Sequence, residues 1–166
     1  MLQIILADIK EDIDDIRELF YGNLSEVQPI IERELNVSFD LDEFLENNIA
    51  HLSEFTAPCG LFLARVDGES VGCAGFRENN QSTVEIKRMY VKSEFRRQGI
   101  GRALLQRIIS EATKLGYTKI RLDTVFFAKE AQKLYRSFGF QEIPPYSESD
   151  IPPNLHPKWI FMELSC

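Results

Sequence analysis

The sequence predicts an α/β or α+β protein with a single mixed sheet flanked by helices. Two observations carry this prediction. Early apolar runs joined by turn signals are typical of antiparallel hairpins, and later strand-like runs alternate with amphipathic helical segments. The length of 166 residues fits one domain, and a hydrophobic share of 44% is sufficient for an ordinary core.

The first third of the chain is expected to hold one strand followed by helices. The expected elements are a strand over Gln3–Ala7 and helices over residues 12–21, 27–35 and 40–55. Acidic residues crowd the first turn of the first helix, where the helix dipole favours them, and Gly22 with Asn23 is expected to end it. Asp40 is suited to cap the third helix, and Pro58 ends the helical pattern.

Strands and helices alternate over the rest of the chain. The strands Gly60–Val66 and Ser70–Arg77 flank the turn signal Asp67-Gly68-Glu69, which predicts a hairpin. The later expected elements are strands over Thr83–Val91, Lys119–Thr124, Phe140–Ile143 and Trp159–Leu164, and helices over Gly101–Leu115 and Ala128–Phe138. Five of the seven prolines lie within Pro144–Lys158, which predicts a loop.

Charge is distributed unevenly along the chain. The net charge of −7 argues against nucleic-acid binding, because phosphate contacts need a basic surface. Residues 1–55 carry three Lys/Arg and fourteen Asp/Glu, whereas residues 84–140 carry thirteen and five. The second region is suited to an anion and the first to a cation, although charges on helices often serve only solubility.

Several features indicate a cytoplasmic protein that does not associate with membranes. No apolar run approaches membrane-spanning length, and the start MLQIILAD lacks the basic residues of a signal peptide. The three cysteines Cys59, Cys73 and Cys166 have no paired spacing, which favours a reducing compartment. With only two histidines, far apart, we expect no metal site.

The segment Arg96–Gly101, Arg-Arg-Gln-Gly-Ile-Gly, predicts an anion site at the start of a helix. A dinucleotide-binding turn is one interpretation, with Asp123 as its acidic residue. Two details oppose it, since Leu104 replaces the third small residue and Lys92–Gln98 separates the glycines from the preceding strand. A Walker loop is excluded, because no Gly-Lys-Ser/Thr follows.

Three motifs in this region resemble the GNAT superfamily of N-acetyltransferases. The strand VEIKRMYV, residues 84–91, resembles the strand before its cofactor loop, RRQGIG matches R/Q-x-x-G-x-G/A, and AQKLYRSFGF, residues 131–140, resembles A-x-x-L-Y-x-x-x-G-F. The resemblance implies a single domain over residues 1–166 with the acyl-CoA N-acyltransferase fold. In that fold a mostly antiparallel mixed sheet carries a central V-shaped parallel splay, and residues 83–140 form the acetyl-CoA-binding core.

The resemblance also implies where acetyl-CoA, the expected co-substrate, would lie. It would sit between the strand ending at Val91 and the strand Lys119–Thr124, with backbone groups of Met89, Tyr90 and Val91 pairing with the pantetheine. The residues implied for the pyrophosphate are Arg96, Arg97, Gln98, Gly99, Ile100, Gly101 and Arg102. Many family members have Asn where this chain has Ala128, so that contact is either missing or supplied by Thr124 or Lys129.

A family-like mechanism is direct attack of a primary amine on the thioester in a ternary complex. The resemblance makes Tyr135 the candidate general acid and the N–H of Val91 the oxyanion donor. Glu85 is the candidate base, directly or through a water, and strand alternation without a bulge places it on the same face as Lys87 and Met89. The competing interpretations are a core aromatic for Tyr135 and an ion-paired strand residue for Glu85.

The resemblance also implies which segments shape the acceptor site. In the family, the early helices and the loop before the last strand shape this site, and here they are residues 1–55 and 144–158. Their acidic residues favour a cationic small-molecule or peptide amine. A non-catalytic acyl-CoA-binding or regulatory module is the alternative function, and the sequence leaves the oligomeric state open, a homodimer included.

Overall fold

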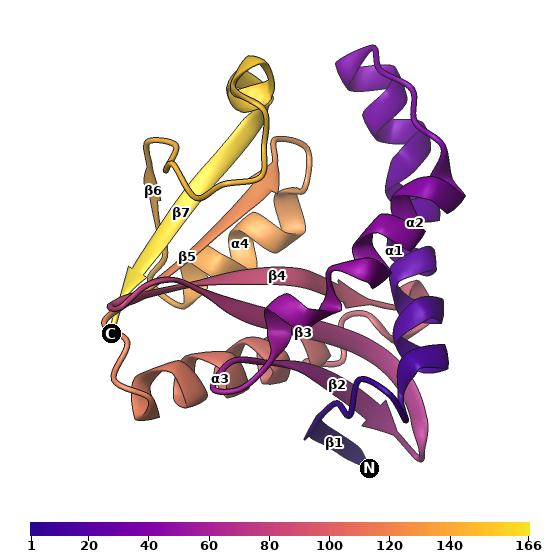
Figure 1. The fold of residues 1–166 in the computed structure, drawn as a ribbon, viewed down its shortest axis with the longest axis vertical. Coiled ribbons are helices and arrows are strands. Elements are labelled where there is room, and N and C mark those ends of the chain that lie inside the picture. The colour runs from indigo at the N-terminus through magenta and orange to yellow at the C-terminus, as the bar shows by residue number, and fades with distance from the viewer.

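Seven strands form one mixed sheet in the computed structural model, which describes all residues from 1 to 166. The strands are β1 Leu2–Leu6, β2 Gly60–Val66, β3 Glu69–Asn80, β4 Thr83–Val91, β5 Lys119–Val125, β6 Gln141–Ile143 and β7 Trp159–Ser165. Their order across the sheet is β1-β2-β3-β4-β5-β7-β6, and only β4 and β5 run parallel (Figure 1). This arrangement confirms the predicted fold class.

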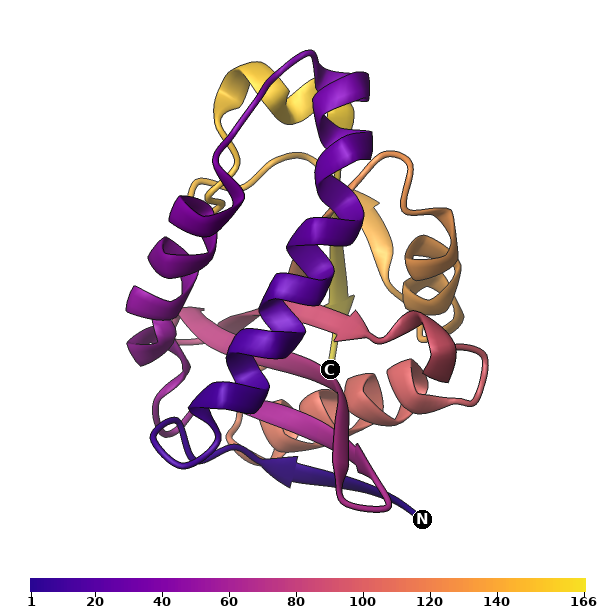
Figure 2. The ribbon, with the colours of Figure 1, turned by 90° about the vertical axis from the view of Figure 1, so that its right-hand side faces the viewer.

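Helices cover both faces of this sheet. The α-helices are α1 Ile13–Leu35, α2 Leu41–Ala50, α3 Ile100–Lys114 and α4 Lys129–Ser137, and the 3₁₀ segments are η1 Leu52–Phe55, η2 Ser93–Phe95 and η3 Pro153–Lys158. The helices α1 and α2 lie on one face, and α3 and α4 on the other (Figures 1 and 2). None of the helices combines the length and the apolar character needed to cross a membrane.

The parallel pair β4 and β5 produces the V-shaped splay. These strands pair only near their first residues, from Thr83 opposite Lys119 to Glu85 opposite Arg121. Beyond Glu85 they diverge, with β5 and β7 turning away from β4 (Figure 1). The edge of β4 that faces β5 therefore lacks a strand partner over its second half, and its backbone groups are available to another extended chain.

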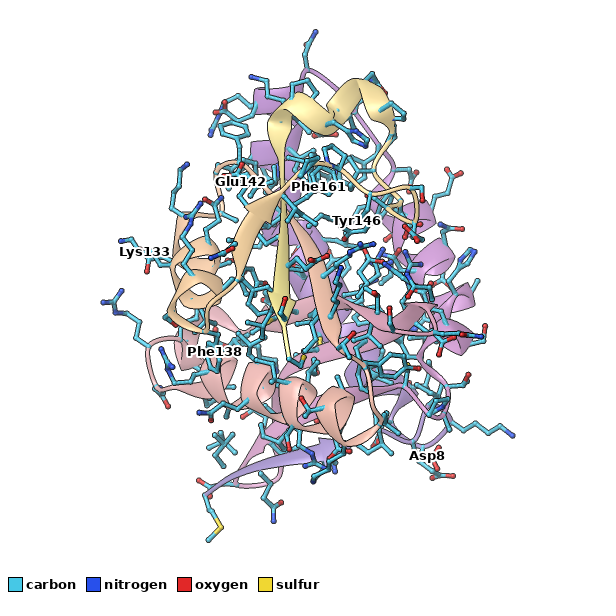
Figure 3. All side chains as sticks on the ribbon, turned by 90° about the vertical axis from the view of Figure 1, so that its left-hand side faces the viewer. Asp8, Lys133, Phe138, Glu142, Tyr146 and Phe161 are labelled. Carbon is cyan, nitrogen blue, oxygen red and sulfur yellow. The ribbon has the colours of Figure 1, made fainter.

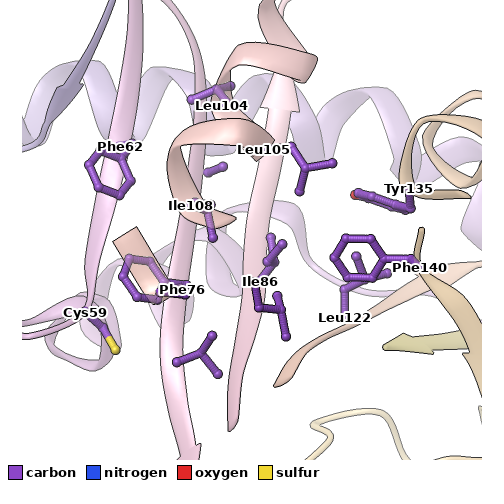
Figure 4. Packing of buried hydrophobic residues seen from close by; sticks show 14 of the residues in the cluster. Cys59, Phe62, Phe76, Ile86, Leu104, Leu105, Ile108, Leu122, Tyr135 and Phe140 are labelled. Atoms are coloured by element: carbon purple, nitrogen blue, oxygen red, sulfur yellow. The ribbon is translucent and has the colours of Figure 1, made fainter. Parts of the chain in front are cut away.

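Two apolar cores hold the sheet on either side of this opening. The core under α3 and α4 includes Phe76, Ile86, Leu104, Leu105, Ile108, Leu122 and Phe140 (Figure 4). The core under α1 and α2 includes Ile16, Leu19, Phe20, Leu45, Leu61 and Leu63. Each fully buried side chain of this kind contributes about 1.5–3 kcal/mol, so both faces of the splayed strands are firmly anchored.

The prediction that Gly22 and Asn23 end the first helix is wrong. Helix α1 continues through both residues and through Pro29, and it ends at Leu35, before Asn36 in the left-handed conformation. Gly22 instead permits close packing, because a Cβ atom there would lie 3.0 Å from the Tyr90 hydroxyl oxygen. The glycine therefore serves a tertiary contact with β4, which periodicity along the helix does not reveal.

The helix expected over residues 40–55 is divided in two. Asp40 caps α2 as predicted, because its side chain accepts a 2.9 Å hydrogen bond from the Glu43 N–H. The helix ends at Ala50, and the chain continues as η1, whose Leu52 and Phe55 are buried. The proline-rich segment 144–158 is a loop as predicted, except for η3 at its end.

Candidate active site

The start of α3 presents a row of backbone N–H groups. From Arg97 to Arg102, six consecutive N–H groups donate to no acceptor in the protein, and the first bond of the helix runs from Ala103 N to Gly99 O at 3.0 Å. Arg97 and Gly99 both have left-handed backbone, with φ of 63° and 80°. Successive N–H groups in such a turn, at the positive end of a helix dipole, form a site for an anion.

The side chains of this loop have separate tasks. Ile100 is buried and anchors the helix start, whereas Arg102 donates to Ser137 of α4 at 3.1 Å. Arg96 donates to the Val91 carbonyl at 2.9 Å and pairs with Glu26 of α1 at 2.6 Å. Arg96 therefore ties the loop to β4 and α1, and its expected contact with a pyrophosphate stays a prediction.

A β-bulge in β4 redirects the side chains that border the V. Gly75 pairs with Lys87 and Cys73 with Tyr90, so Arg88 and Met89 together face one residue of β3. Arg88 has left-handed backbone, with φ of 59°. The expected alternation is therefore wrong beyond the bulge.

The contacts on the two faces of β4 follow from this bulge. On the face of α1 and α2, Glu85 and Lys87 contact the loop 144–158. On the opposite face, Met89 packs in the core under α3 and α4, beside Tyr135. Glu85 and Met89 thus border the V from opposite sides.

Tyr135 lies where β4, α3 and α4 meet. It is buried, its ring packs beside Phe140 with centroids 5.9 Å apart (Figure 4), and its hydroxyl contacts the Met89 sulfur at 3.7 Å. Burial, reinforced by the charge of Asp123, raises the pKa of Tyr135 to about 12. The phenol therefore keeps its proton at neutral pH and is able to donate it.

Glu85 is fully buried at the base of the V and is closely held. One carboxylate oxygen accepts from Arg77, at 2.9 Å from Nε and 2.8 Å from Nη2. The other accepts a 2.7 Å hydrogen bond from the hydroxyl of Tyr146. Tyr146 in turn packs edge-on against Phe161 of β7, with ring centroids 5.5 Å apart (Figure 3).

Asp123 is a candidate site residue that the resemblance to the GNAT superfamily does not indicate. It lies on β5, two residues beyond Arg121, and its only hydrogen-bond donor is the Trp159 indole N–H at 3.1 Å. Burial, and secondly the nearby charge of Glu85, raise the pKa of Asp123 to about 6. An acidic residue on a buried strand at the V was visible in the sequence, but neither Trp159 nor the burial was.

Gln132 stabilises the turn that precedes α4. Ala128 occupies the N-cap position and supplies no side-chain hydrogen bond. The buried Gln132 amide instead donates to the carbonyls of Val125 at 3.2 Å and Phe126 at 3.1 Å. Gln132 thus holds this turn without a side-chain cap at Ala128, and the expected roles of Thr124 and Lys129 toward acetyl-CoA stay predictions.

The acidic segment 1–55 finds many of its counter-charges within the protein. The pairs include Asp12 with Arg65 at 2.8 Å, Glu18 with Lys92 at 3.2 Å, Glu26 with Arg96 at 2.6 Å and Glu54 with Arg77 at 2.9 Å. The pairs of Lys92 and Arg96 join the acidic segment to residues 84–140, so part of the charge asymmetry serves the attachment of these two regions.

None of the cysteines is placed as a nucleophile, although the Cys73 thiol donates to the Arg88 carbonyl at the bulge at 3.1 Å. Cys73 is fully buried, and burial raises the pKa of its thiol to about 12, which makes it a poor nucleophile. Cys59 is also buried, and Cys166 lies exposed near the C-terminus.

Comparison with known proteins places the chain in a family. A family model described as the acetyltransferase (GNAT) family matches residues 14–140. An uncharacterized N-acetyltransferase of Schizosaccharomyces pombe is 30% identical over 155 residues, which are 91% of this chain and 90% of that protein. The chain belongs to the acetyltransferase (GNAT) family.

Further relatives and solved structures agree with this assignment. The N-acetylaspartate synthetase of Danio rerio is 32% identical over 117 residues, 68% of this chain but only 41% of that protein. The structure of yncA from Salmonella typhimurium with acetyl-CoA has a TM-score of 0.68 at 23% identity and covers 99% of this chain and 93% of that one. The paiA N-acetyltransferase of Thermoplasma acidophilum, in complex with coenzyme A, has a TM-score of 0.74 at 15% identity and covers 100% and 99%. At these identities the two structures share the fold with this chain.

Proposed function

We propose that the protein transfers the acetyl group of acetyl-CoA to a primary amine by direct attack in a ternary complex. The observation that carries this proposal is the row of six N–H groups from Arg97 to Arg102 at the start of α3. A pyrophosphate needs several converging donors at a helix N-terminus, and this turn supplies them. The unpaired edge of β4 beyond Glu85 offers backbone groups to a pantetheine arm.

The reaction needs an acid, an oxyanion donor and a base. A C–N bond forms as the amine attacks the thioester carbon, and the C–S bond then breaks. Tyr135, protonated at neutral pH, is the proposed donor of a proton to the leaving thiolate. The backbone N–H of Val91 is the proposed donor to the developing oxyanion.

Two carboxylates compete for the role of the base. Glu85 stays a candidate, but Arg77 and Tyr146 already engage both of its oxygens. Asp123 accepts a single hydrogen bond and pairs with no cation. A pKa raised to about 6 also makes its carboxylate a better proton acceptor than an ordinary one. We therefore propose Asp123 as the base and Glu85 as the residue that holds the floor of the V in place.

The acceptor is proposed to be a small-molecule or peptide amine that enters beside α1, α2 and the loop 144–158. The expectation of a cationic amine stays a prediction, with less support because many of the acidic residues are paired internally. The name N-acetylaspartate synthetase states a product for the zebrafish relative. This chain spans too little of that protein for its acceptor to be transferred.

A thermal-shift measurement followed by a thiol-release assay tests the proposal. A ligand that binds only the folded state raises the melting temperature, so a large excess of acetyl-CoA should do so. Thiol release that depends on an added amine would then establish transfer. Acetyl-CoA binding without thiol release from any amine would favour the non-catalytic module instead, and no shift at all would overturn both.

A further inference from the structure

Four cationic side chains border the site on the face of α1 and α2, and three of them are paired. Arg77 lies 2.9 Å from Glu54 and 2.8 Å from Glu85, Arg121 lies 2.8 Å from Glu163, and Lys87 pairs with Asp150. The fourth, Arg88, has no carboxylate within salt-bridge distance, although it is next to Lys87 in the sequence.

Arg88 is held by a single neutral contact. One terminal nitrogen donates to the side-chain oxygen of Asn48 on α2 at 3.0 Å, and its Nε is buried without an acceptor. Burial lowers the pKa of this guanidinium, and the charges of Glu54 and Asp150 offset only part of that effect. A buried donor of this kind is costly, and an explanation is needed for its presence in a native protein.

The backbone gives Arg88 its position. Because φ is 59° at the bulge, the Arg88 side chain lies on the same face of the sheet as Lys87, the face of α1 and α2. Ordinary alternation would send it to the core face of Ile86 and Met89. A left-handed arginine is uncommon, and such strain is concentrated at functional sites.

Asp123, on the other arm of the V, is a carboxylate that forms no ion pair. It has no cation within salt-bridge distance and accepts only from Trp159. The last paired residues of the two arms are Glu85 and Arg121. At the rise of a strand, Asp123 lies about 7 Å beyond that pair and Arg88 about 10 Å beyond it. A carboxylate and a guanidinium thus stand on the two diverging strands.

We propose that the acceptor is an amino acid whose carboxylate binds Arg88 and whose ammonium group faces Asp123. This inference rests on the proposed function. Arg88 retains N–H donors for a charge-assisted pair with a carboxylate, while Asn48 fixes the guanidinium. A polyamine would bring a second cation to Arg88 and leave the buried Nε without an acceptor.

The transfer step balances with these groups. The ammonium proton passes to Asp123, the amine nitrogen bonds to the acetyl carbon, and the C–S bond breaks. The thiolate takes its proton from Tyr135. The second proton of the nitrogen, released as the amide forms, returns to the Tyr135 phenolate through solvent, so that the products are an N-acetylamino acid and free coenzyme A.

The test compares the common amino acids with their own carboxamides in a thiol-release assay with acetyl-CoA. For the best amino acid, we expect kcat/KM about tenfold or more above that of its carboxamide, as for a lost charged hydrogen bond. Arg88→Gln should raise KM for the acid, bring the ratio near one and leave KM for acetyl-CoA unchanged. The matched control is Arg107→Gln, because Arg107 bonds Ile4 O and Glu111 on the α3 side and should keep the ratio.

Equal turnover of acids and carboxamides, or turnover of polyamines but not amino acids, would overturn this inference and leave the proposed function standing. An unchanged ratio in Arg88→Gln would overturn it as well. If that variant does not fold, Arg88→Asn replaces it, since Asn tolerates a left-handed backbone. If no amine releases thiol, the proposed function fails. The site is then judged by whether amino acids raise the melting temperature of the wild type but not of the variant.

Discussion

Replacing Asp123 by Asn should make the protein more stable and much less active. The pKa of Asp123 is raised from 3.8 to about 6, so the folded state binds this proton more tightly than the unfolded chain does. At pH 7 the ionised carboxylate therefore costs the folded state stability. A shift of about two units corresponds to about 3 kcal/mol. Asparagine removes the charge, and its side-chain oxygen is able to keep the Trp159 hydrogen bond.

The gain in stability should have a defined pH dependence. It is full above pH 6, shrinks as the pH falls from about 6 toward 3.8, and disappears below both values, where Asp123 is protonated in either state. For a chain of this length, about 3 kcal/mol corresponds to roughly 6–12 °C in melting temperature. Calorimetry between pH 4 and pH 8 measures this difference directly.

The activity of the same variant should move the opposite way. Loss of a general base lowers kcat by about 10²–10⁴-fold, and the acidic limb of the kcat/KM profile near pH 6 should vanish. The melting-temperature rise with acetyl-CoA should persist, which separates chemistry from cofactor binding.

Glu85→Gln is the matched control for this variant. It removes the charge of the fully buried partner of Arg77, which keeps Glu54 at 2.9 Å and Asp150 at 3.2 Å, and the loss of a charged hydrogen bond costs about 1.5–3 kcal/mol. We therefore expect Glu85→Gln to lose stability where Asp123→Asn gains it. An Asp123→Asn protein that melts lower than the wild type, or that keeps wild-type kcat, would refute the reasoning.

Three further substitutions test the rest of the site. Tyr135→Phe should lower kcat by about 10²-fold with little change in melting temperature, because the hydroxyl contacts only the Met89 sulfur. A clear fall in melting temperature together with the fall in kcat would indicate a structural role. Gly101→Glu should abolish the melting-temperature rise caused by acetyl-CoA. The control Gly101→Ala should fold normally, since its Cβ would lie 3.4 Å from the nearest atom, on Leu134. Normal acetyl-CoA binding by the Glu variant would show that the loop is only a turn. Gln132→Ala should destabilise the protein by about 1–3 kcal/mol in denaturant unfolding, because the Phe126 carbonyl loses its donor and the Val125 carbonyl keeps only the Ala128 N–H. An unchanged midpoint would contradict this.

The features predicted well from the sequence are those that depend on neighbours along the chain. Hydrophobic periodicity predicted β4 with its observed bounds and α3 to within a residue at each end. The cap at Asp40 and the glycine turn before α3 are equally local, because each requires a particular residue at one backbone position. The family motifs depend on the same local patterns, which is why they indicated the fold and the anion site together.

Contacts between distant residues were decided only by the tertiary structure. Tyr146 binds Glu85 across 61 positions of sequence, and Trp159 reaches Asp123 across 36. The sequence predicted a helix end at Gly22, whereas in the structure this glycine allows Tyr90 to pack against the helix. The bulge at Arg88 places Met89 on the face opposite to the expected one. A pKa or an unpaired charge depends on burial and on groups brought close in space. The sequence by itself therefore determined the fold and the glycine turn before α3, while the folded chain decided that Glu85 is paired and Asp123 is not.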